Sequence, residues 1–283
     1  MHKAIALGEL ADEGWKNYCK IMTMKILITS GGTKIPIDRV RSITNMSRGT
    51  FGSRIADAFF HQGLEAFRSE DKENVVEKIT FFTAKNGKLP TAQSLNDETY
   101  EDGYRPLDII SYSTFDDYKS GIEDLLKKET YDIIVVAAAV SDYGVANYYD
   151  GKYRSREDDM CIKLVKLPKV LPIMRKLAPE SVICGFKLLV DSTDGELLDA
   201  MKNQIAESDV DLVIGNDLRD IKANDHKLTI ISKSNSTPRT YTLPAPSKRF
   251  PSIVYPLAKS VVDECFDAYR VKAKAKTEKD IQR

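Results

Sequence analysis

Short apolar runs alternate with amphipathic segments along most of the chain. The runs at 25–29, 78–83, 108–113, 131–140, 181–188 and 211–215 have the length of buried strands. Between them, residues 53–62, 115–128 and 194–208 carry apolar side chains at helical spacing. Residues 228–232 predict an edge or hairpin strand, and residues 253–269 predict a closing helix. This alternation is typical of an α/β fold with a doubly wound, mostly parallel, Rossmann-like sheet.

Polar segments between these runs predict the loops and the domain limits. Residues 85–106 indicate a long surface loop, residues 163–177 a strand end and a short helix, and Gly63 the C-cap of the helix at 53–62. The glycine-bearing, basic and aromatic stretch 143–159 predicts a mobile flap beside a small edge or dimerisation element. We expect an N-terminal appendage at 1–24, the main domain at 25–270 and a basic tail at 271–283, frayed after Lys272.

Composition excludes several classes of function. The 283 residues contain 42 Lys and Arg against 42 Asp and Glu, so no net field favours nucleic acid. Three histidines make a Ser-His-Asp triad or a histidine-rich metal centre a poor expectation. The four cysteines are far apart and predict reduced thiols in a cytoplasmic protein. No run approaches the ~20 apolar residues of a membrane helix, and residues 1–24 lack the pattern of a secretory signal.

Two glycine-bearing turns carry the first chemical signal. Ser30, Gly31 and Gly32 interrupt the first apolar run, and residues 45–52 (Asn-Met-Ser-Arg-Gly-Thr-Phe-Gly) lead into the first helix. A helix start presents unpaired N–H groups, and glycines let an anion approach the backbone. These turns predict a floor for phosphate or carboxylate at the carboxyl edge of the sheet. Neither the dinucleotide fingerprint nor the Walker sequence is present, so turns without a ligand stay an open alternative.

Three further stretches end predicted strands at the same edge: 138–142 (Ala-Ala-Val-Ser-Asp), 184–187 (Cys-Gly-Phe-Lys) and 215–217 (Gly-Asn-Asp). Together with the two glycine turns, this ordered set resembles phosphopantothenate-cysteine ligase, also called phosphopantothenoylcysteine synthetase. The likeness covers about residues 24–269 and is greatest to the stand-alone bacterial form. Segments 167–169 and 186–191 resemble both that form and the eukaryotic enzyme. A fused flavin-dependent decarboxylase half, known in other members, is not found in the sequence, so no flavin is expected.

The resemblance implies a reaction in coenzyme A biosynthesis. 4'-Phosphopantothenate, L-cysteine and a nucleoside triphosphate would give phosphopantothenoylcysteine, a nucleoside monophosphate and pyrophosphate, with an acyl-nucleotidylate as intermediate and Mg²⁺ accompanying the triphosphate. The bacterial character favours CTP, with ATP as the alternative. The family also implies a homodimer with shared active sites, in which Arg41 reaches into the neighbouring subunit's site.

The resemblance further assigns roles to individual residues. Asn45 would be catalytic by holding the carboxylate and then the acyl intermediate, and Lys152 by binding the triphosphate and the leaving pyrophosphate. Phosphopantothenate would be bound by Arg41, Asn45, Ala138, Ala139 and Asp142. The nucleotide would be bound by Gly31, Ser47, Gly49, Gly52, Lys152, Phe186 and Asn216. No metal ligand is expected from the chain itself.

Simpler structural interpretations and two other functions stay open. Asn45 could be a turn or N-cap residue, Phe186 and the alanines could be core, and Lys152 and Arg41 could be solvated. The sequence also departs from the family pattern at Arg48 and at residues 152–155, Lys-Tyr-Arg-Ser, where many members have Lys-Ile-Lys-Lys. The Tyr-x-x-x-Lys pattern at 148–152 would suit a nicotinamide-dependent Rossmann reductase, although an Asp-Gly pair interrupts it. A non-catalytic flavodoxin-like binding module is the other alternative.

Overall fold

The computed structural model describes residues 23–69, 75–97, 103–154, 160–222, 227–242 and 254–281. The predicted N-terminal appendage lies almost entirely outside these residues.

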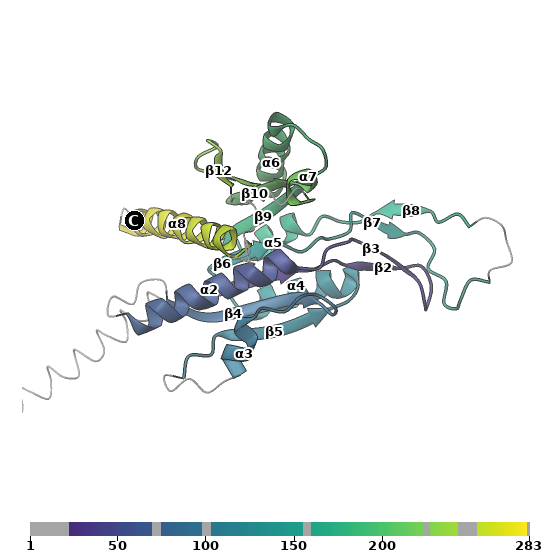
Figure 1. The fold of residues 1–283 in the computed structure, drawn as a ribbon, viewed down its shortest axis with the longest axis horizontal. Helices are drawn as coiled ribbons and strands as arrows, with labels where there is room; N and C mark the ends of the chain where they lie inside the picture. Colours follow the sequence, from purple (N-terminus) through teal and green to yellow (C-terminus); the bar gives the residue numbers. More distant parts are fainter. Residues whose placement is uncertain are drawn as a thin grey trace, which may run out of the picture.

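An eight-stranded sheet forms the centre of the molecule (Figure 1). In spatial order its strands are β12 (Arg239–Thr242), β11 (Lys227–Ser232), β10 (Leu212–Asp217), β9 (Val182–Leu189), β6 (Ile133–Val136), β1 (Thr23–Ser30), β4 (Val75–Ala84) and β5 (Leu107–Tyr112). The strands from β10 to β5 run parallel, and β11 pairs antiparallel with both of its neighbours. The predicted doubly wound, mostly parallel sheet is therefore confirmed.

Helices cover both faces of the sheet. Successive side chains of a strand point to opposite faces, and the apolar side chains on both faces are buried by helices. On β1, Ile26 and Ile28 join the core with α2 (Thr50–Arg68) and α8 (Val254–Ile281). Leu27 points to the other face. That face is covered by α4 (Phe115–Lys128), α5 (Leu171–Leu177) and α6 (Asp194–Ser208). Two short helices, α3 (Ala92–Asp97) and α7 (Leu218–Lys222), lie in connections.

Three sequence predictions about these elements are wrong. Gly63 does not end a helix, since α2 continues to Arg68. A Cβ at Gly63 would lie 2.2 Å from Tyr104 Oη and 2.8 Å from Val76 Cβ, so this glycine permits close packing of α2. The predicted loop 85–106 contains α3. The prediction of a frayed segment after Lys272 is also wrong, because α8 continues to Ile281.

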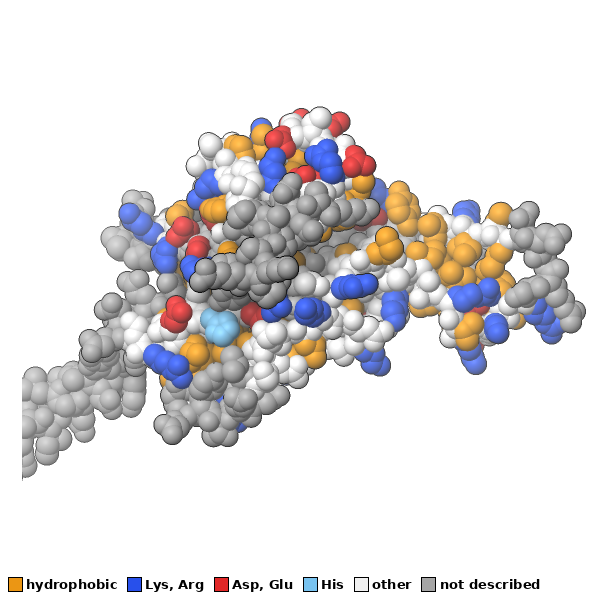
Figure 2. All heavy atoms as spheres, viewed as in Figure 1, with side chains coloured by type: hydrophobic (Ala, Val, Ile, Leu, Met, Phe, Trp, Pro, Cys, Tyr) orange, Lys and Arg blue, Asp and Glu red, His pale blue; other side chains and the backbone are white. Residues whose placement is uncertain are grey.

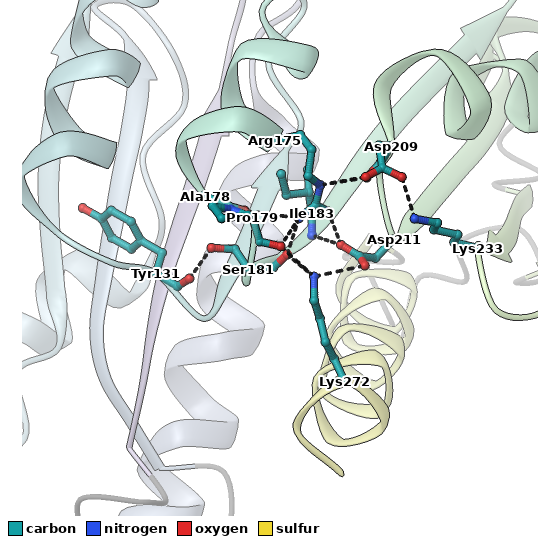
Figure 3. Close-up of polar contacts among 10 residues, drawn as sticks. All are labelled: Tyr131, Arg175, Ala178, Pro179, Ser181, Ile183, Asp209, Asp211, Lys233 and Lys272. Atoms are coloured by element: carbon teal, nitrogen blue, oxygen red, sulfur yellow. Dashed lines mark hydrogen bonds and ion pairs between the residues drawn. The ribbon is translucent and has the colours of Figure 1, made fainter. Parts of the chain in front are cut away.

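A polar cluster at the amino ends of β9 and β10 anchors α8 at Lys272 (Figure 3). Lys272 Nζ donates to Ser181 O at 2.9 Å and lies 3.4 Å from Asp211 Oδ1. Arg175 pairs with the same carboxylate and donates to the carbonyl of Ser181 at 2.9 Å. Burial lowers the pKa of Lys272, against the opposite effect of Asp211. The cluster holds α8 and α5 at the sheet edge opposite to the glycine turns.

Two hairpins project beyond the sheet, and we call them the arm (Figure 1). They are β2 (Lys34–Pro36) with β3 (Ser42–Thr44), and β7 (Tyr143–Val145) with β8 (Leu164–Lys166). A bridge between Asp38 and Tyr149 joins the two hairpins. The arm contains the described part of the predicted flap, whose residues 155–159 lie outside the described residues.

Candidate functional site

The candidate site lies where the chain reverses its direction of progress across the sheet. From β1 the chain adds β4 and β5 on one side, and then returns to place β6 on the other side of β1. Gly31 follows β1 and Ala139 follows β6, and the Ala139 N–H donates to Gly31 O at 2.8 Å. Open α/β sheets form their ligand crevice at such a switch point, beyond the carboxyl ends of the strands.

The second glycine turn packs directly onto the first. Gly49 is the N-cap of α2, in the left-handed conformation with φ 71°, and its carbonyl accepts a hydrogen bond from Ser30 Oγ at 3.0 Å. A Cβ at Gly52 would lie only 2.4 Å from Ser30 Oγ. The α2 N-terminus therefore stands over the end of β1, and no side chain caps it in the described part of the chain. Its first N–H groups are available to an anion, and the floor for phosphate or carboxylate stays a prediction.

Asn45 lies beside this floor and contacts both strand ends. Its Nδ2 donates to Ala139 O at 2.8 Å, and a Cβ at Gly32 would lie 2.8 Å from the Asn45 carbonyl oxygen. The side chain is exposed, so the second N–H of its amide is available to a ligand. Because Gly49 caps α2, the alternative that Asn45 is the N-cap is wrong. Ser47 Oγ accepts a weak hydrogen bond from Gly49 N at 3.4 Å.

Two buried tyrosines fix the strand ends beneath the floor. Tyr112 Oη donates to Ser30 O at 2.6 Å, and Tyr118 Oη donates to Thr29 Oγ1 at 3.2 Å. Burial raises the pKa of both hydroxyls, so they stay neutral donors at physiological pH. Thr29 Oγ1 is also 3.4 Å from the N–H of Ala138, which connects this support to the loop after β6.

Phe186 and Asn216 lie on the neighbouring strands, β9 and β10. The Phe186 ring meets that of Phe51, in the first turn of α2, edge-on with centroids 5.8 Å apart. Asn216 is the second-last residue of β10. The strand ends at Asp217, a buried carboxylate that accepts a hydrogen bond from Ser192 N at 2.8 Å. The pKa of the Asp217 carboxyl is lowered to about 2, and the hydrogen bond from the Ser192 N–H makes the largest contribution. Phe186 packs on the core and is only partly buried, so it can also offer a face to a base.

Arg41 and Lys152 lie on the arm, apart from Asn45. Arg41 Nη2 is 2.6 Å from Oδ2 of the buried Asp38. This hydrogen bond is the largest of the effects that hold the pKa of the Asp38 carboxyl well below its usual range. Asp38 Oδ2 also accepts from Tyr153 N at 3.2 Å, and Gly151 O accepts from Arg39 N at 3.0 Å. Lys152, between these two anchors, is exposed. The arm therefore presents Arg41 and Lys152 together.

Asp142 connects the floor to the arm. Its carboxylate is 2.6 Å from Lys169 Nζ, and its carbonyl accepts from Leu167 N at 2.9 Å. The predicted site residues thus form two groups: a floor at the switch point, and an arm that carries Arg41 and Lys152. Sequence reasoning missed Ser30 and Asp38, which position these groups. A serine directly before Gly-Gly and an aspartate three residues before Arg41 were the available signals.

Other features of the described residues bear on the alternatives. Tyr148 and Lys152 lie in the loop after β7 and not on a helix, so the arrangement of a short-chain reductase is not formed. Among the described residues, no three His, Cys, Asp or Glu side chains are grouped to hold a metal ion. Cys161, Cys184 and Cys265 are free. None of the helices in the described part of the chain is long and apolar enough to cross a membrane.

Comparison with known proteins identifies the family. Residues 21–77 and 107–251 match the model of the DNA/pantothenate metabolism flavoprotein C-terminal domain. The chain belongs to this family. The coenzyme A biosynthesis bifunctional proteins CoaBC of Thermococcus kodakarensis and Methanocaldococcus jannaschii are 27% and 30% identical to it, over 74% and 69% of this chain. The chain spans only 45% and 40% of the length of these relatives.

Further relatives agree with the resemblance found in the sequence. Human phosphopantothenate–cysteine ligase is 26% identical over 59% of this chain and 64% of its own length. The DNA/pantothenate metabolism flavoprotein of Streptococcus pneumoniae is 26% identical, with a TM-score of 0.67 over 87% of this chain and 99% of its own. A Cab2 mutant in complex with phosphopantothenate-cysteine has a TM-score of 0.68 at 19% identity, covering 96% of both chains, and shows the shared fold. The family-level resemblance is therefore confirmed.

Proposed function

We propose that this chain joins 4'-phosphopantothenate to L-cysteine at the expense of a nucleoside triphosphate, in the cytoplasm, as a step of coenzyme A biosynthesis. The observation that carries the proposal is the meeting of Gly31, Asn45, Ala139 and Gly49 at the switch point of a chain of this family. The name of the human ligase supports the reaction, and the names of the two bifunctional relatives support its place in coenzyme A biosynthesis. CTP is the favoured nucleotide, with ATP as the alternative.

The floor suits the first chemical step. A carboxylate oxygen of phosphopantothenate attacks the α-phosphorus of the triphosphate, and the bond from that phosphorus to pyrophosphate breaks. Such a step needs alignment and neutralisation of negative charge more than it needs a base. The N–H groups at the start of α2 and the glycine turns would hold the phosphates, while Asn45 would hold the carboxylate. Phe186 and Asn216 would contact the base, and Ala138, Ala139 and Asp142 the pantothenate chain.

The second step uses the same amide. The cysteine nitrogen attacks the acyl carbon, nucleoside monophosphate leaves with one former carboxylate oxygen, and the amine loses a proton. Asn45 keeps one N–H on Ala139 O at 2.8 Å, which fixes the amide so that the other N–H can donate to the developing oxyanion. Asn45 would thus serve both steps without changing its charge.

Mg²⁺ would accompany the triphosphate. Magnesium in such sites is bound largely by phosphate oxygens and water, which suits a site without three grouped acidic side chains among the described residues. When bound, it would neutralise charge on the phosphates. Lys152, on the exposed side of the arm, would supply a positive charge for the leaving pyrophosphate.

The arm supports a homodimer with shared sites. It exposes a band of large apolar side chains, visible on the right of Figure 2. The band contains Val40 (64% exposed), Tyr143 (56%), Tyr148 (52%), Leu164 (44%) and Val165 (42%). An exposed apolar surface of this kind marks an interaction site. A second copy of the chain would cover it, and Arg41 on the same arm would then reach the neighbouring floor.

The test is the release of pyrophosphate by the purified chain with Mg²⁺, L-cysteine and either CTP or ATP, with and without phosphopantothenate. The proposal predicts release that depends on phosphopantothenate and is faster with CTP. Faster release with ATP would reverse the nucleotide assignment alone. A folded chain that releases no pyrophosphate with either nucleotide would contradict the proposed function.

A further inference from the structure

The buried carboxylate of Asp38 connects the two cations that the arm presents. Asp38 lies in the turn between β2 and β3, and its side chain is fully buried. Its Oδ1 accepts hydrogen bonds from the N–H groups of Val40 at 2.9 Å and Arg41 at 2.7 Å. Its Oδ2 accepts from Arg41 Nε at 2.9 Å, from Arg41 Nη2 at 2.6 Å and from Tyr153 N at 3.2 Å. One carboxylate therefore holds the Arg41 guanidinium and the backbone next to Lys152.

The backbone of Lys152 is anchored to this turn on both sides. Before it, Gly151 O accepts a hydrogen bond from Arg39 N at 3.0 Å. After it, Tyr153 donates its N–H to the carboxylate, and its carbonyl accepts from Arg41 Nη2 at 3.3 Å. Arg41 Cζ also lies 5.7 Å from the centre of the Tyr153 ring, within the range of a cation–π contact. The peptide groups that flank Lys152 are thus fixed relative to Arg41, while its side chain stays exposed.

Asp38 also decides which donors Arg41 can offer to a ligand. A guanidinium has five N–H donors, and here Nε and Nη2 are occupied by Asp38 and by the Tyr153 carbonyl. Nη1 takes part in no hydrogen bond with the described residues, and the side chain is partly exposed. If Arg41 left Asp38, a buried carboxylate would lose its cation, which is strongly unfavourable. Arg41 therefore reaches a ligand with Nη1, by a movement of the whole arm.

We propose that Asp38 is a positioning residue that holds Arg41 and Lys152 as one unit, so that both cations enter the same active site. The proposal rests on the proposed function and deepens it. There, the arm that projects beyond the sheet (Figure 1) carries Arg41 to the floor of the neighbouring subunit. Lys152 moves with Arg41 and so serves that same floor. Each active site of the dimer then combines the floor of one subunit with both cations of the other.

Calorimetry of each substrate tests the role of Asp38. Asp38→Asn keeps the size of the side chain and removes its charge, so it should weaken binding of phosphopantothenate and of CTP together, each roughly 10- to 100-fold. Arg41→Ala should weaken mainly phosphopantothenate, and Lys152→Ala mainly CTP. Asp150→Asn is the matched control, because Asp150 pairs with Arg39 on the same arm, but both side chains are exposed. An exposed pair contributes little, so the control should bind both substrates as the wild type does.

A change of background separates positioning from a merely structural role. When Arg41→Ala and Lys152→Ala are already present, adding Asp38→Asn should lower neither substrate affinity nor turnover further, because no cation is left to position. It should also raise the Tm of the Arg41→Ala variant, since it removes a buried charge that has lost its partner. An undiminished further loss of affinity in that background would overturn the proposal. So would unchanged binding of both substrates by Asp38→Asn alone.

Mixed subunits test whether the two cations share a site. Arg41→Ala subunits mixed with Lys152→Ala subunits should release pyrophosphate no faster than the separate variants, because each arm lacks one cation. Lys152→Ala mixed with Asn45→Ala should recover activity, because one site then has an intact floor and an intact arm. Recovery in the first mixture would overturn the proposal while leaving the ligase function intact. A wild-type chain that binds both substrates without turnover would contradict the ligase function, and the calorimetry would still test the coupling through Asp38.

Discussion

The contact between Gly52 and Ser30 sets the position of α2, and replacing Gly52 by alanine tests it. The new Cβ would lie 2.4 Å from Ser30 Oγ and 2.8 Å from Ser30 Cβ. Turning the hydroxyl away would break its 3.0 Å hydrogen bond to Gly49 O and would still leave the Cβ contact. Either the start of α2 or the end of β1 must therefore move, and both belong to the proposed phosphate floor.

The size of the effect follows from these contacts. Overpacking by one methyl group costs ~1–3 kcal/mol, and a lost hydrogen bond costs about 1 kcal/mol. The better helix propensity of alanine returns about 0.5–1 kcal/mol. We expect Gly52→Ala to lose roughly 1–3 kcal/mol of unfolding free energy, or ~3–10 °C in Tm for a chain of this size. Affinity for CTP should fall as well.

Urea and thermal unfolding, with calorimetry of CTP binding, would measure both effects. Ser30→Gly removes both clashing atoms, so the double variant should be more stable than the sum of the single effects by ~1–2 kcal/mol. Gly195→Ala is the matched control, because it lies in the first turn of α6 and the nearest atom to its Cβ would be 4.0 Å away. A Gly52→Ala variant with wild-type stability and CTP affinity, or strict additivity with Ser30→Gly, would refute this reasoning.

Three further predictions concern catalysis, assembly and pH. Asn45→Ala should lower turnover by roughly 10²–10³ without loss of Tm, the scale of one oxyanion donor; near-normal turnover of the folded variant would reject its role. Mixing Arg41→Ala with Asn45→Ala subunits should restore part of the activity if sites are shared, and no recovery despite proven subunit exchange would argue against sharing. Folding lowers the pKa of Asp217 from 3.8 to about 2, so its stabilising contribution is complete above 3.8 and is lost as the pH falls through 2. Asp217→Asn should therefore flatten the fall of unfolding free energy in that pH window, and an unchanged acid limb would contradict the assignment.

Local signals explain which parts of the fold could be predicted from the sequence. The limits of α4 and α6 agree with the prediction because capping boxes at Thr114 with Asp117, and at Thr193 with Glu196, mark both helix starts. The gathering of Gly31, Gly49 and Ala139 was predictable because the carboxyl ends of parallel strands share one edge of the sheet.

The errors arise where distant contacts override local preference. Gly63 resembles a C-cap in sequence, yet Tyr104 and Val76 require a residue without a side chain inside α2. The end of α8 resembles a frayed tail, but Lys272 is held by Ser181 and Asp211. A hollow of about 340 Å³ is lined both by Lys34, the first residue of β2, and by Lys85, which follows β4. These residues are about 50 positions apart, and no local spacing brings them together. Pairing of Arg41 with Asp38 was equally hidden, since short-range charge pairs are common on solvated surfaces.

The most direct test of the central claim follows an oxygen atom. Phosphopantothenate labelled with ¹⁸O in its carboxylate is turned over with CTP, L-cysteine and Mg²⁺, and the products are analysed by mass spectrometry. An acyl-nucleotidylate intermediate transfers one ¹⁸O to the nucleoside monophosphate and leaves the pyrophosphate unlabelled, alongside phosphopantothenoylcysteine. Label in inorganic phosphate together with a nucleoside diphosphate would show an acyl-phosphate intermediate and contradict the account, as would the absence of the cysteine amide.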